Sequence, residues 1–275
     1  MHFETSLITI KQLQENFDNP KIVVVDCTID KVGQSMKGSQ LRLIPNSLFF
    51  DIENKFSDVK NSLPHTLVAA DEFTKEIQTL GIDNDNIIIL YDRWGIYSSP
   101  RAWWMFKVMG FEQVFVLDGG LPAWEKEKLP VMNTYLIPTK AGNATAQFSP
   151  QYYAGKATIL SAYNNRDISI IDARSQERFN ATAPEPRAGL LGGHIPHSHN
   201  LPFDRVLDGN YYRSKEELTS LFSDYCDHQI YTCGSGVTAS ILAFASYLSG
   251  NKNISVYDGS WSEWGQKELK LPIER

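Results

Sequence analysis

One cysteine of the chain stands where covalent chemistry is favoured. Cys233 follows a short apolar run and precedes an apolar helical pattern, in the stretch Tyr231-Thr232-Cys233-Gly234-Ser235-Gly236-Val237-Thr238. At the carboxyl end of a strand and facing the first turn of a helix, a cysteine meets free N–H groups and partial positive charge, which favour the thiolate. Gly234 and Gly236 let the backbone curl so that its amides point at an anion, and Ser235 and Thr238 add hydroxyl donors. The spacing predicts a nucleophilic thiolate at Cys233.

The other two cysteines, Cys27 and Cys226, lack such a loop, and we interpret both as structural. No two cysteines form a Cys-x-x-Cys pair, so the sequence predicts neither a disulfide framework nor a metal site. A phosphatase loop would need an arginine six positions after Cys233, where Ala239 stands. The cysteine usage and an amino-terminal stretch without an apolar signal core favour the reducing cytoplasm.

Two arginines are the next candidates for chemistry. Arg178 and Arg187 follow the first strand pattern of the second half of the chain and have no counterpart at the matching places of the first half. A planar guanidinium binds a carboxylate through two parallel hydrogen bonds. We therefore predict that this pair binds a carboxylate-bearing substrate. Arg174, two residues after Asp172, is interpreted as part of a structural ion pair.

The elements that must position these residues occur twice, in the same order, which indicates a tandem duplication. The matching pieces are Asp118-Gly119-Gly120 with Asp258-Gly259-Ser260, Trp124 with Trp264, Ile22–Asp26 with Ile168–Asp172, and Ile44–Ser47 with Ile195–Ser198. Short apolar runs predict buried parallel strands at Ile22–Val25, Ile87–Leu90, Val114–Val116, Ile168–Ile171, Gln229–Thr232 and Ile254–Val256.

Helical patterns lie between these runs, at Asp71–Leu80, Ser99–Met109, Ser214–Asp224 and Val237–Leu248. Asp71 and Ser214 are predicted N-caps, and Gly81 and Gly110 are predicted helix ends. The alternation is typical of an α/β fold, with an open parallel sheet flanked by helices on both faces in each copy. The Pro- and Gly-containing stretch 135–156 is the predicted linker between domains 1–134 and 157–275.

Composition and charge limit the classes of partner. The chain has 275 residues, of which 42% are apolar and 21% charged, a balance typical of a globular protein with real cores. Its net charge of −6 argues against nucleic acid, whose phosphates require a basic face. No apolar run approaches the roughly 20 residues of a membrane span, so we expect no membrane partner.

Taken together, these motifs resemble the rhodanese family over nearly the whole chain. The resemblance rests on Cys-Gly-Ser-Gly-Val-Thr-Ala from Cys233, Pro-Glu-Pro-Arg ending at Arg187, Gly-His-Ile-Pro-x-Ser-x-Asn over Gly193–Asn200, and the tandem layout. It implies two rhodanese-like domains, the second catalytic. The first is implied to be non-catalytic, because Asp92 stands in the cysteine's place.

The resemblance also implies residue roles. Cys233 would be the nucleophile that carries sulfur as a persulfide, with Ser235 near the transferred sulfur. Arg178 and Arg187 would hold the carboxylate and ketone of the substrate. The implied amide cradle runs through Gly234, Ser235, Gly236, Val237 and Thr238.

The reaction implied by the nearest members of the family moves sulfur from 3-mercaptopyruvate to Cys233 and releases pyruvate. The sulfur then passes to a thiol, such as thioredoxin or a small thiol, or to cyanide, without a metal or an organic cofactor. Members that use thiosulfate usually carry a basic residue where this chain has Gly234. Thiosulfate as donor, and a sulfur-relay or regulatory module with little turnover, remain alternatives.

One departure from the family concerns proton transfer. Members often combine an aspartate, matched here by Asp51, with a histidine about eleven residues later. Ser62 stands at that place, and the nearest histidine is His65. We therefore retain Asp51 and His65 only as candidates for a proton relay.

Overall fold

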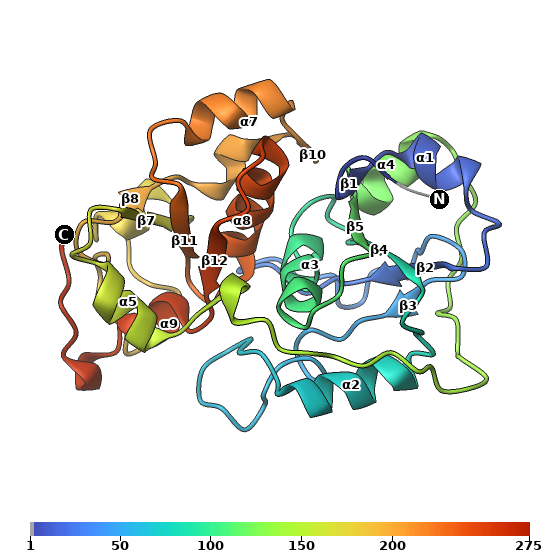
Figure 1. Cartoon of the computed structure of the whole chain (residues 1–275), viewed down its shortest axis with the longest axis horizontal. Coiled ribbons are helices and arrows are strands. Elements are labelled where there is room, and N and C mark those ends of the chain that lie inside the picture. Colours follow the sequence, from blue (N-terminus) through green and yellow to red (C-terminus); the bar gives the residue numbers. More distant parts are fainter. Residues whose placement is uncertain (1–2) are drawn as a thin grey trace. The chain divides into compact units, whose positions relative to one another are not determined.

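The structure of the protein is a computed structural model that describes residues 3–275 and divides them into two compact units (Figure 1). Unit 1 contains the chain up to Asp58, Leu67–Ser149 and Gly209–Tyr212. Unit 2 contains Val59–Thr66, Pro150–Asp208 and Arg213–Arg275. Each half of the chain therefore contributes one short segment to the unit that the other half builds. The predicted linker is divided at Ser149, and its longer part belongs to unit 1.

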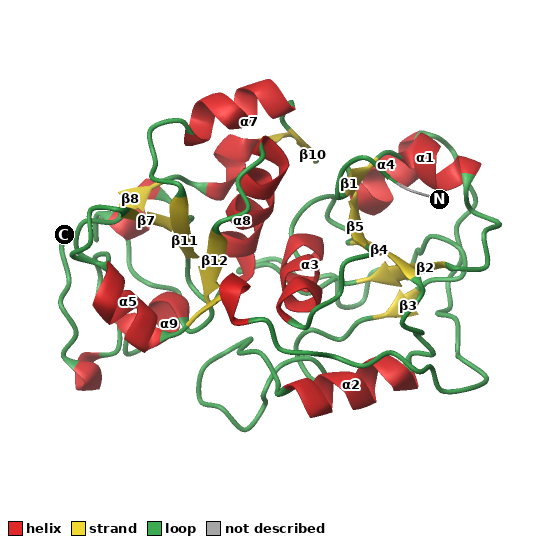
Figure 2. Ribbon diagram, viewed as in Figure 1, coloured by secondary structure: helices red, strands yellow, loops and turns green. Residues whose placement is uncertain are grey.

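Each unit is built on a five-stranded parallel sheet, drawn in yellow in Figure 2. The order in unit 1 is β1-β5-β4-β2-β3, with β1 at Leu7–Ile8, β2 at Ile22–Asp26, β3 at Leu48–Phe49, β4 at Ile87–Tyr91 and β5 at Val114–Leu117. The order in unit 2 is β6-β12-β11-β7-β8, with β6 at Tyr153–Ala154, β7 at Ile168–Asp172, β8 at His199–Asn200, β11 at His228–Thr232 and β12 at Ile254–Tyr257. The two orders coincide once the repeats are aligned.

Helices flank the sheets, which confirms the predicted α/β class. The helices of unit 1 are α1 (Ile10–Glu15), α2 (Ala70–Thr79), α3 (Ser99–Val108) and α4 (Gly120–Lys126). Those of unit 2 are α5 (Lys156–Ala162), α6 (Gln176–Phe179), α7 (Lys215–Phe222), α8 (Val237–Ser249) and α9 (Ser260–Trp264). Short strands β9 (Leu207–Asp208) and β10 (Tyr211–Tyr212) and three 3₁₀ turns, η1 (Pro150–Tyr152), η2 (Phe203–Val206) and η3 (Lys267–Leu269), complete the described chain. Within that chain, no helix is long and apolar enough to cross a membrane.

The predicted helix ends were correct at three of four positions. Ser214 caps α7 by accepting the Glu217 N–H at 3.3 Å. Gly81 and Gly110 directly follow the C-cap residues of α2 and α3 with φ of 70° and 82°, where glycine is favoured. The prediction for Asp71 was wrong. The helix begins one residue earlier, at Ala70, so the Asp71 carboxylate lies in the first turn.

The duplication extends to individual hydrogen bonds. The indole N–H of Trp124 donates to the Pro130 carbonyl at 2.7 Å, and that of Trp264 donates to the Pro272 carbonyl at 2.9 Å. Each tryptophan is buried in the apolar core of its own unit. The repeat alignment made on sequence is therefore also an alignment of three-dimensional contacts.

Candidate active site

The loop that carries Cys233 connects β11, which ends at Thr232, to α8, which begins at Val237. Gly236 turns the chain into the helix with a φ of 80°, a conformation that glycine adopts without a steric penalty. The first N–H groups of α8 have no acceptor inside the helix and are available to an anion. Cys233 itself is 2% exposed, so its surroundings are largely protein rather than water.

The start of α9 holds this loop in place. The Trp261 N–H donates to the Cys233 carbonyl at 2.9 Å, and the Ser262 N–H donates to the Gly234 carbonyl at 2.9 Å. The Ser262 hydroxyl donates to the same carbonyl at 2.6 Å, and the Cys233 N–H donates to Ser260 Oγ at 3.3 Å. Because α9 binds both carbonyls, the conformation of the loop does not depend on a bound substrate.

The matching loop of unit 1 already contains an anion. Asp92 is fully buried, and its Oδ2 accepts the N–H groups of Tyr97, Ser98 and Ser99 at 2.8, 3.0 and 2.9 Å. Its Oδ1 accepts the Trp94 N–H at 3.0 Å. In this loop, several backbone amides therefore point at one carboxylate. That carboxylate stands at the position equivalent to Cys233 of unit 2.

The two predicted arginines lie beside the cysteine loop. A Cβ atom added to Gly234 would lie 3.2 Å from Arg178 Nη2 and 3.6 Å from Arg187 Nη1. The structure thus brings Arg178 and Arg187 together at the residue that follows Cys233. Arg187 Nη2 also donates to Ser235 Oγ at 3.5 Å.

Glu185 positions the first of these arginines. Arg178 Nη2 donates to Glu185 Oε2 at 2.6 Å, and the Glu185 side chain is only 2% exposed. Arg174 Nη1 donates to Glu185 Oε1 at 2.8 Å, while its Nη2 donates to Asp172 Oδ2 at 2.6 Å. Arg174 is therefore the structural ion-pair residue that the sequence predicted. Sequence reasoning did not single out Glu185, although an acid between two arginines was a visible signal.

His65 lies next to Ser235, although 170 residues separate them in the chain. Its Nδ1 is 3.1 Å from Ser235 Oγ, and both residues belong to unit 2. The carboxylate of Asp51, in unit 1, accepts the N–H of Asn54 at 3.0 Å and the Asn54 side-chain amide at 3.0 Å. The geometry thus places His65 in the site, while the Asp51 carboxylate is bonded within its own turn.

The other two cysteines differ from Cys233. Cys27 is fully buried, and burial raises the pKa of its thiol well above the usual value. Cys226 donates its S–H to the Arg166 carbonyl at 3.2 Å. Cys27 follows β2 but no helix begins after it, and Cys226 precedes β11. Among the described residues, no group of three or more His, Cys, Asp and Glu side chains forms a metal-binding cluster.

Comparison with known proteins identifies the family of the chain. The family model of the rhodanese-like domain matches residues 9–127 and 157–267. The 3-mercaptopyruvate sulfurtransferase of Escherichia coli (strain K12) is 36% identical over 270 residues, which is 95% of this chain and 95% of that protein. The human protein of the same name is 37% identical over 230 residues, covering 81% of this chain and 77% of that one. The crystal structure of SseA from Escherichia coli matches with a TM-score of 0.84 and 32% identity, over 94% of this chain and 100% of that chain. The chain therefore belongs to the rhodanese family.

Proposed function

We propose that the protein is a sulfurtransferase that takes sulfur from 3-mercaptopyruvate onto Cys233 and passes it to a thiol. The observation that carries this proposal is the pairing of Arg178 and Arg187 at Gly234, directly beside a cysteine in an amide-lined loop. A thiolate nucleophile and a carboxylate-binding pair are the two groups that this reaction requires.

In the first half-reaction, the Cys233 thiolate attacks the sulfur atom of 3-mercaptopyruvate, and the carbon–sulfur bond breaks. The electron pair of that bond passes to carbon as the enolate of pyruvate, which gains a proton to leave as pyruvate. Cys233 retains the sulfur as a persulfide. Arg178 and Arg187 hold the carboxylate and stabilise the developing enolate oxygen, because positive donors already in place cost little reorganisation.

The amides of Gly234 and Gly236–Thr238 line the loop in which the thiolate and then the persulfide are held. Asp92 in unit 1 supports this role, because four backbone amides of the equivalent loop bind its carboxylate. Ser235, in contact with both His65 and Arg187, is the proposed proton route to the enolate carbon. Asp51 is not required in this scheme.

In the second half-reaction, an acceptor takes the outer sulfur and regenerates the Cys233 thiolate. A small thiol or the dithiol of a protein such as thioredoxin leaves as a persulfide, and cyanide leaves as thiocyanate. Three free cysteines suit a reducing compartment, and we propose the cytoplasm.

Gly234 favours mercaptopyruvate over thiosulfate as donor. Thiosulfate is compact and doubly charged, and a cation within the loop would bind it best. Gly234 provides none, and the positive charge lies instead on two guanidinium groups suited to a planar carboxylate. The intact thiol loop argues against a module with little turnover.

Intact-mass measurement tests the proposal. After incubation with 3-mercaptopyruvate, the wild-type protein and Cys226→Ser should each gain the mass of one sulfur atom and release pyruvate. Cys233→Ser should do neither while unfolding at the wild-type denaturant concentration. A folded Cys233→Ser protein that still transfers sulfur would contradict the assignment.

A further inference from the structure

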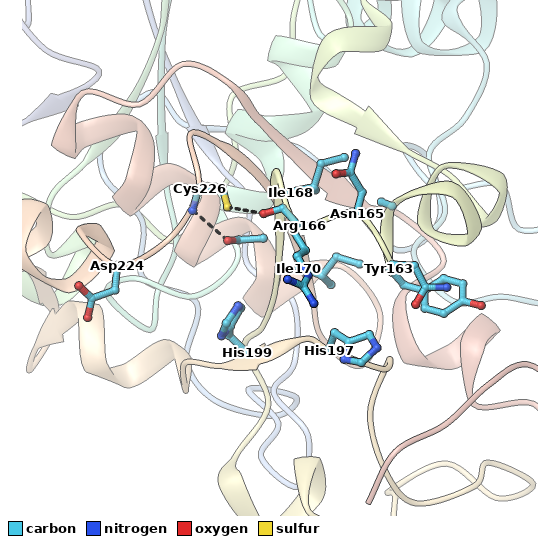
Figure 3. Close-up of a pocket in the computed structure, with 12 residues that line it drawn as sticks. Tyr163, Asn165, Arg166, Ile168, Ile170, His197, His199, Asp224 and Cys226 are labelled. Atoms are coloured by element: carbon cyan, nitrogen blue, oxygen red, sulfur yellow. Dashed lines mark hydrogen bonds between the residues drawn. The ribbon is translucent and has the colours of Figure 1, made fainter.

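A cavity lies in unit 2, away from the cysteine loop. It has a volume of about 490 Å³, and it opens where β7 and β11 begin, whereas Cys233 follows the end of β11. Figure 3 shows Tyr163, Arg166, His197 and His199 around it, with Cys226 on its wall. The volume lies within the range of about 300–1,000 Å³ that ligand sites usually have. The proposed sulfur transfer leaves this cavity unused.

The duplication provides a template for interpreting this cavity, because unit 1 has a groove at the matching place. The groove has a volume of about 330 Å³, and part of its lining is equivalent to that of the unit 2 cavity. Ile22 opens β2 there as Ile168 opens β7. Asn46 and His197 are also equivalent, and share the unusual φ of 61° and 60°.

In unit 1, a segment of the chain itself runs along one side of this groove. Leu136–Lys140 forms one wall of the groove. The Leu136 N–H donates to the Ser47 carbonyl at 2.9 Å, one residue before the edge strand β3. Pro138 packs against Gly81, where an added Cβ would come within 3.0 Å of the proline ring. One side of the unit 1 groove is therefore closed by a chain segment that a backbone hydrogen bond and apolar packing hold in place.

No described residue takes this place in unit 2. Glu274 pairs with His194 through two backbone hydrogen bonds, of 2.9 and 3.0 Å, as Met132 pairs with Leu43 in unit 1. In unit 1, the segment that lines the groove follows Met132, the equivalent of Glu274. The matching cavity is larger, and Ser198, the equivalent of Ser47, precedes edge strand β8.

The walls of the two grooves differ in charge. Arg166 stands where unit 1 has Pro20, and His199 stands where unit 1 has Leu48. Two carboxylates are near: Asp224 lies apart from His197 on the other side of the cavity, and Glu274 Oε2 accepts the His197 N–H at 3.1 Å. The guanidinium and the two imidazoles that line the cavity suit a carboxylate on the bound ligand.

We propose that the cavity at the amino ends of β7 and β11 is a docking groove for an extended, acidic peptide segment of a partner protein. The peptide backbone donates to the Ser198 carbonyl, as Leu136 does to Ser47, and so extends the sheet edge at β8. Apolar peptide side chains pack on Ile168 and Ile170, and an acidic side chain pairs with Arg166.

Two labelled peptides test this groove by fluorescence anisotropy. One has the sequence of residues Tyr135–Lys140, and the other has the same sequence with Thr139→Glu and Lys140→Glu. We expect the acidic peptide to bind more tightly. Arg166→Glu should weaken its binding about tenfold or more, which is the usual effect of reversing a paired charge. Arg205→Glu, a matched reversal at another exposed arginine of unit 2, should leave binding within about twofold of wild type.

Two further measurements, of cysteine alkylation and of sulfur transfer, test the proposal. In a Cys233→Ser background, the bound acidic peptide should slow alkylation of Cys226, the partly exposed cysteine of the wall. Arg166→Glu should keep wild-type sulfur transfer, because Arg166 and Cys233 lie at opposite ends of the strands. The proposal is overturned if neither peptide binds at about 1 mM. It is equally overturned if Arg166→Glu and Arg205→Glu weaken binding alike, or if Arg166→Glu only dissolves a dimer of this chain.

Discussion

Arg187 is the residue whose charge is most available to a substrate. Arg178 already donates to the buried Glu185 carboxylate at 2.6 Å, whereas no described ion pair involves Arg187. Arg187→Ala should therefore lower kcat/KM for 3-mercaptopyruvate by about 2–5 kcal/mol of transition-state binding, the cost expected for a desolvated charge pair. Arg187→Lys, measured in parallel, should recover only part of this, since an ammonium cannot form the paired contact. Unchanged turnover by Arg187→Ala would refute the proposed carboxylate site.

Gly234 sets the room available between the two guanidinium groups and the loop. Because a Cβ there would lie 3.2 Å from Arg178 Nη2, any larger side chain must displace an arginine. Gly234→Arg combined with Ser235→Lys should lower kcat/KM for 3-mercaptopyruvate and raise it for thiosulfate, which gains cations within the loop. Steady-state kinetics with both donors measure the shift. A wild-type protein that prefers thiosulfate would contradict the donor assignment but not the persulfide chemistry.

The residues that sequence reasoning found and missed differ in how local their signals are. The pattern of Cys233 and the glycines around it lies within one loop, and Arg174 was correctly interpreted as a structural ion-pair residue. His65 reaches Ser235 across 170 residues, and no local pattern specifies such a contact. The family spacing of about eleven residues after Asp51 leads to Ser62, and the histidine that contacts Ser235 lies further along, at position 65.

At the scale of elements, the loop after the central strand is an anion-binding device used in two ways. In unit 1 the backbone amides of this loop bind the Asp92 carboxylate. In unit 2 the equivalent loop carries Cys233. Asp92→Ala leaves several buried N–H groups without their acceptor, and should destabilise the protein by about 3 kcal/mol or more. Catalysis per folded molecule should stay near wild type, because unit 1 supplies no thiol. Urea unfolding and kcat measured on the same samples separate the two effects, and a lost kcat at full stability would show that unit 1 takes part in the chemistry.

The central strands of unit 1, β2, β4 and β5, were predictable because their sequences are apolar at nearly every position. Ile87–Tyr91 is buried throughout, as expected for a strand covered on both faces, and its predicted bounds were correct to one residue. The edge strands β1, β3, β6 and β8 have only two residues each and were not predicted. A two-residue strand has no periodicity, and its pairing depends on the neighbouring strand.

At the scale of the whole molecule, the chain exchanges short segments between its two units. Val59–Thr66 carries His65 into unit 2, and Gly209–Tyr212 belongs to unit 1. Asn210 lies so close to Gly95 that an added Cβ would come within 2.7 Å of it. Such exchange cannot be derived from periodicity, because both segments are short and contacts such as His65–Ser235 and Tyr212–Asp118 are distant in sequence. It also explains why a boundary drawn at the linker does not describe either unit fully.

Asp118 gives this exchange a measurable dependence on pH. Its carboxylate accepts the N–H of Tyr212, from the exchanged segment, at 3.0 Å. Burial raises the pKa of Asp118 from 3.8 to about 6, although the hydrogen bonds from Tyr212 and Gly119 act to lower it. Because the folded state holds this proton more tightly than the unfolded state, the contribution of Asp118 to stability is complete below about pH 4 and is lost as pH rises through 6.

Asp118→Asn removes the charge but keeps an oxygen that accepts the Tyr212 N–H. Relative to wild type, the variant should therefore be more stable at pH 7–8 by about 1–2 kcal/mol, a value reduced from the full shift because the carboxyl is only partly buried. At pH 4 the two proteins should differ little. Urea unfolding of both proteins at intervals between these pH values measures the difference. A difference that stays constant across the range would mean that Asp118 is already ionised at pH 4 in the folded protein, and that its burial in unit 1 has no influence on its titration.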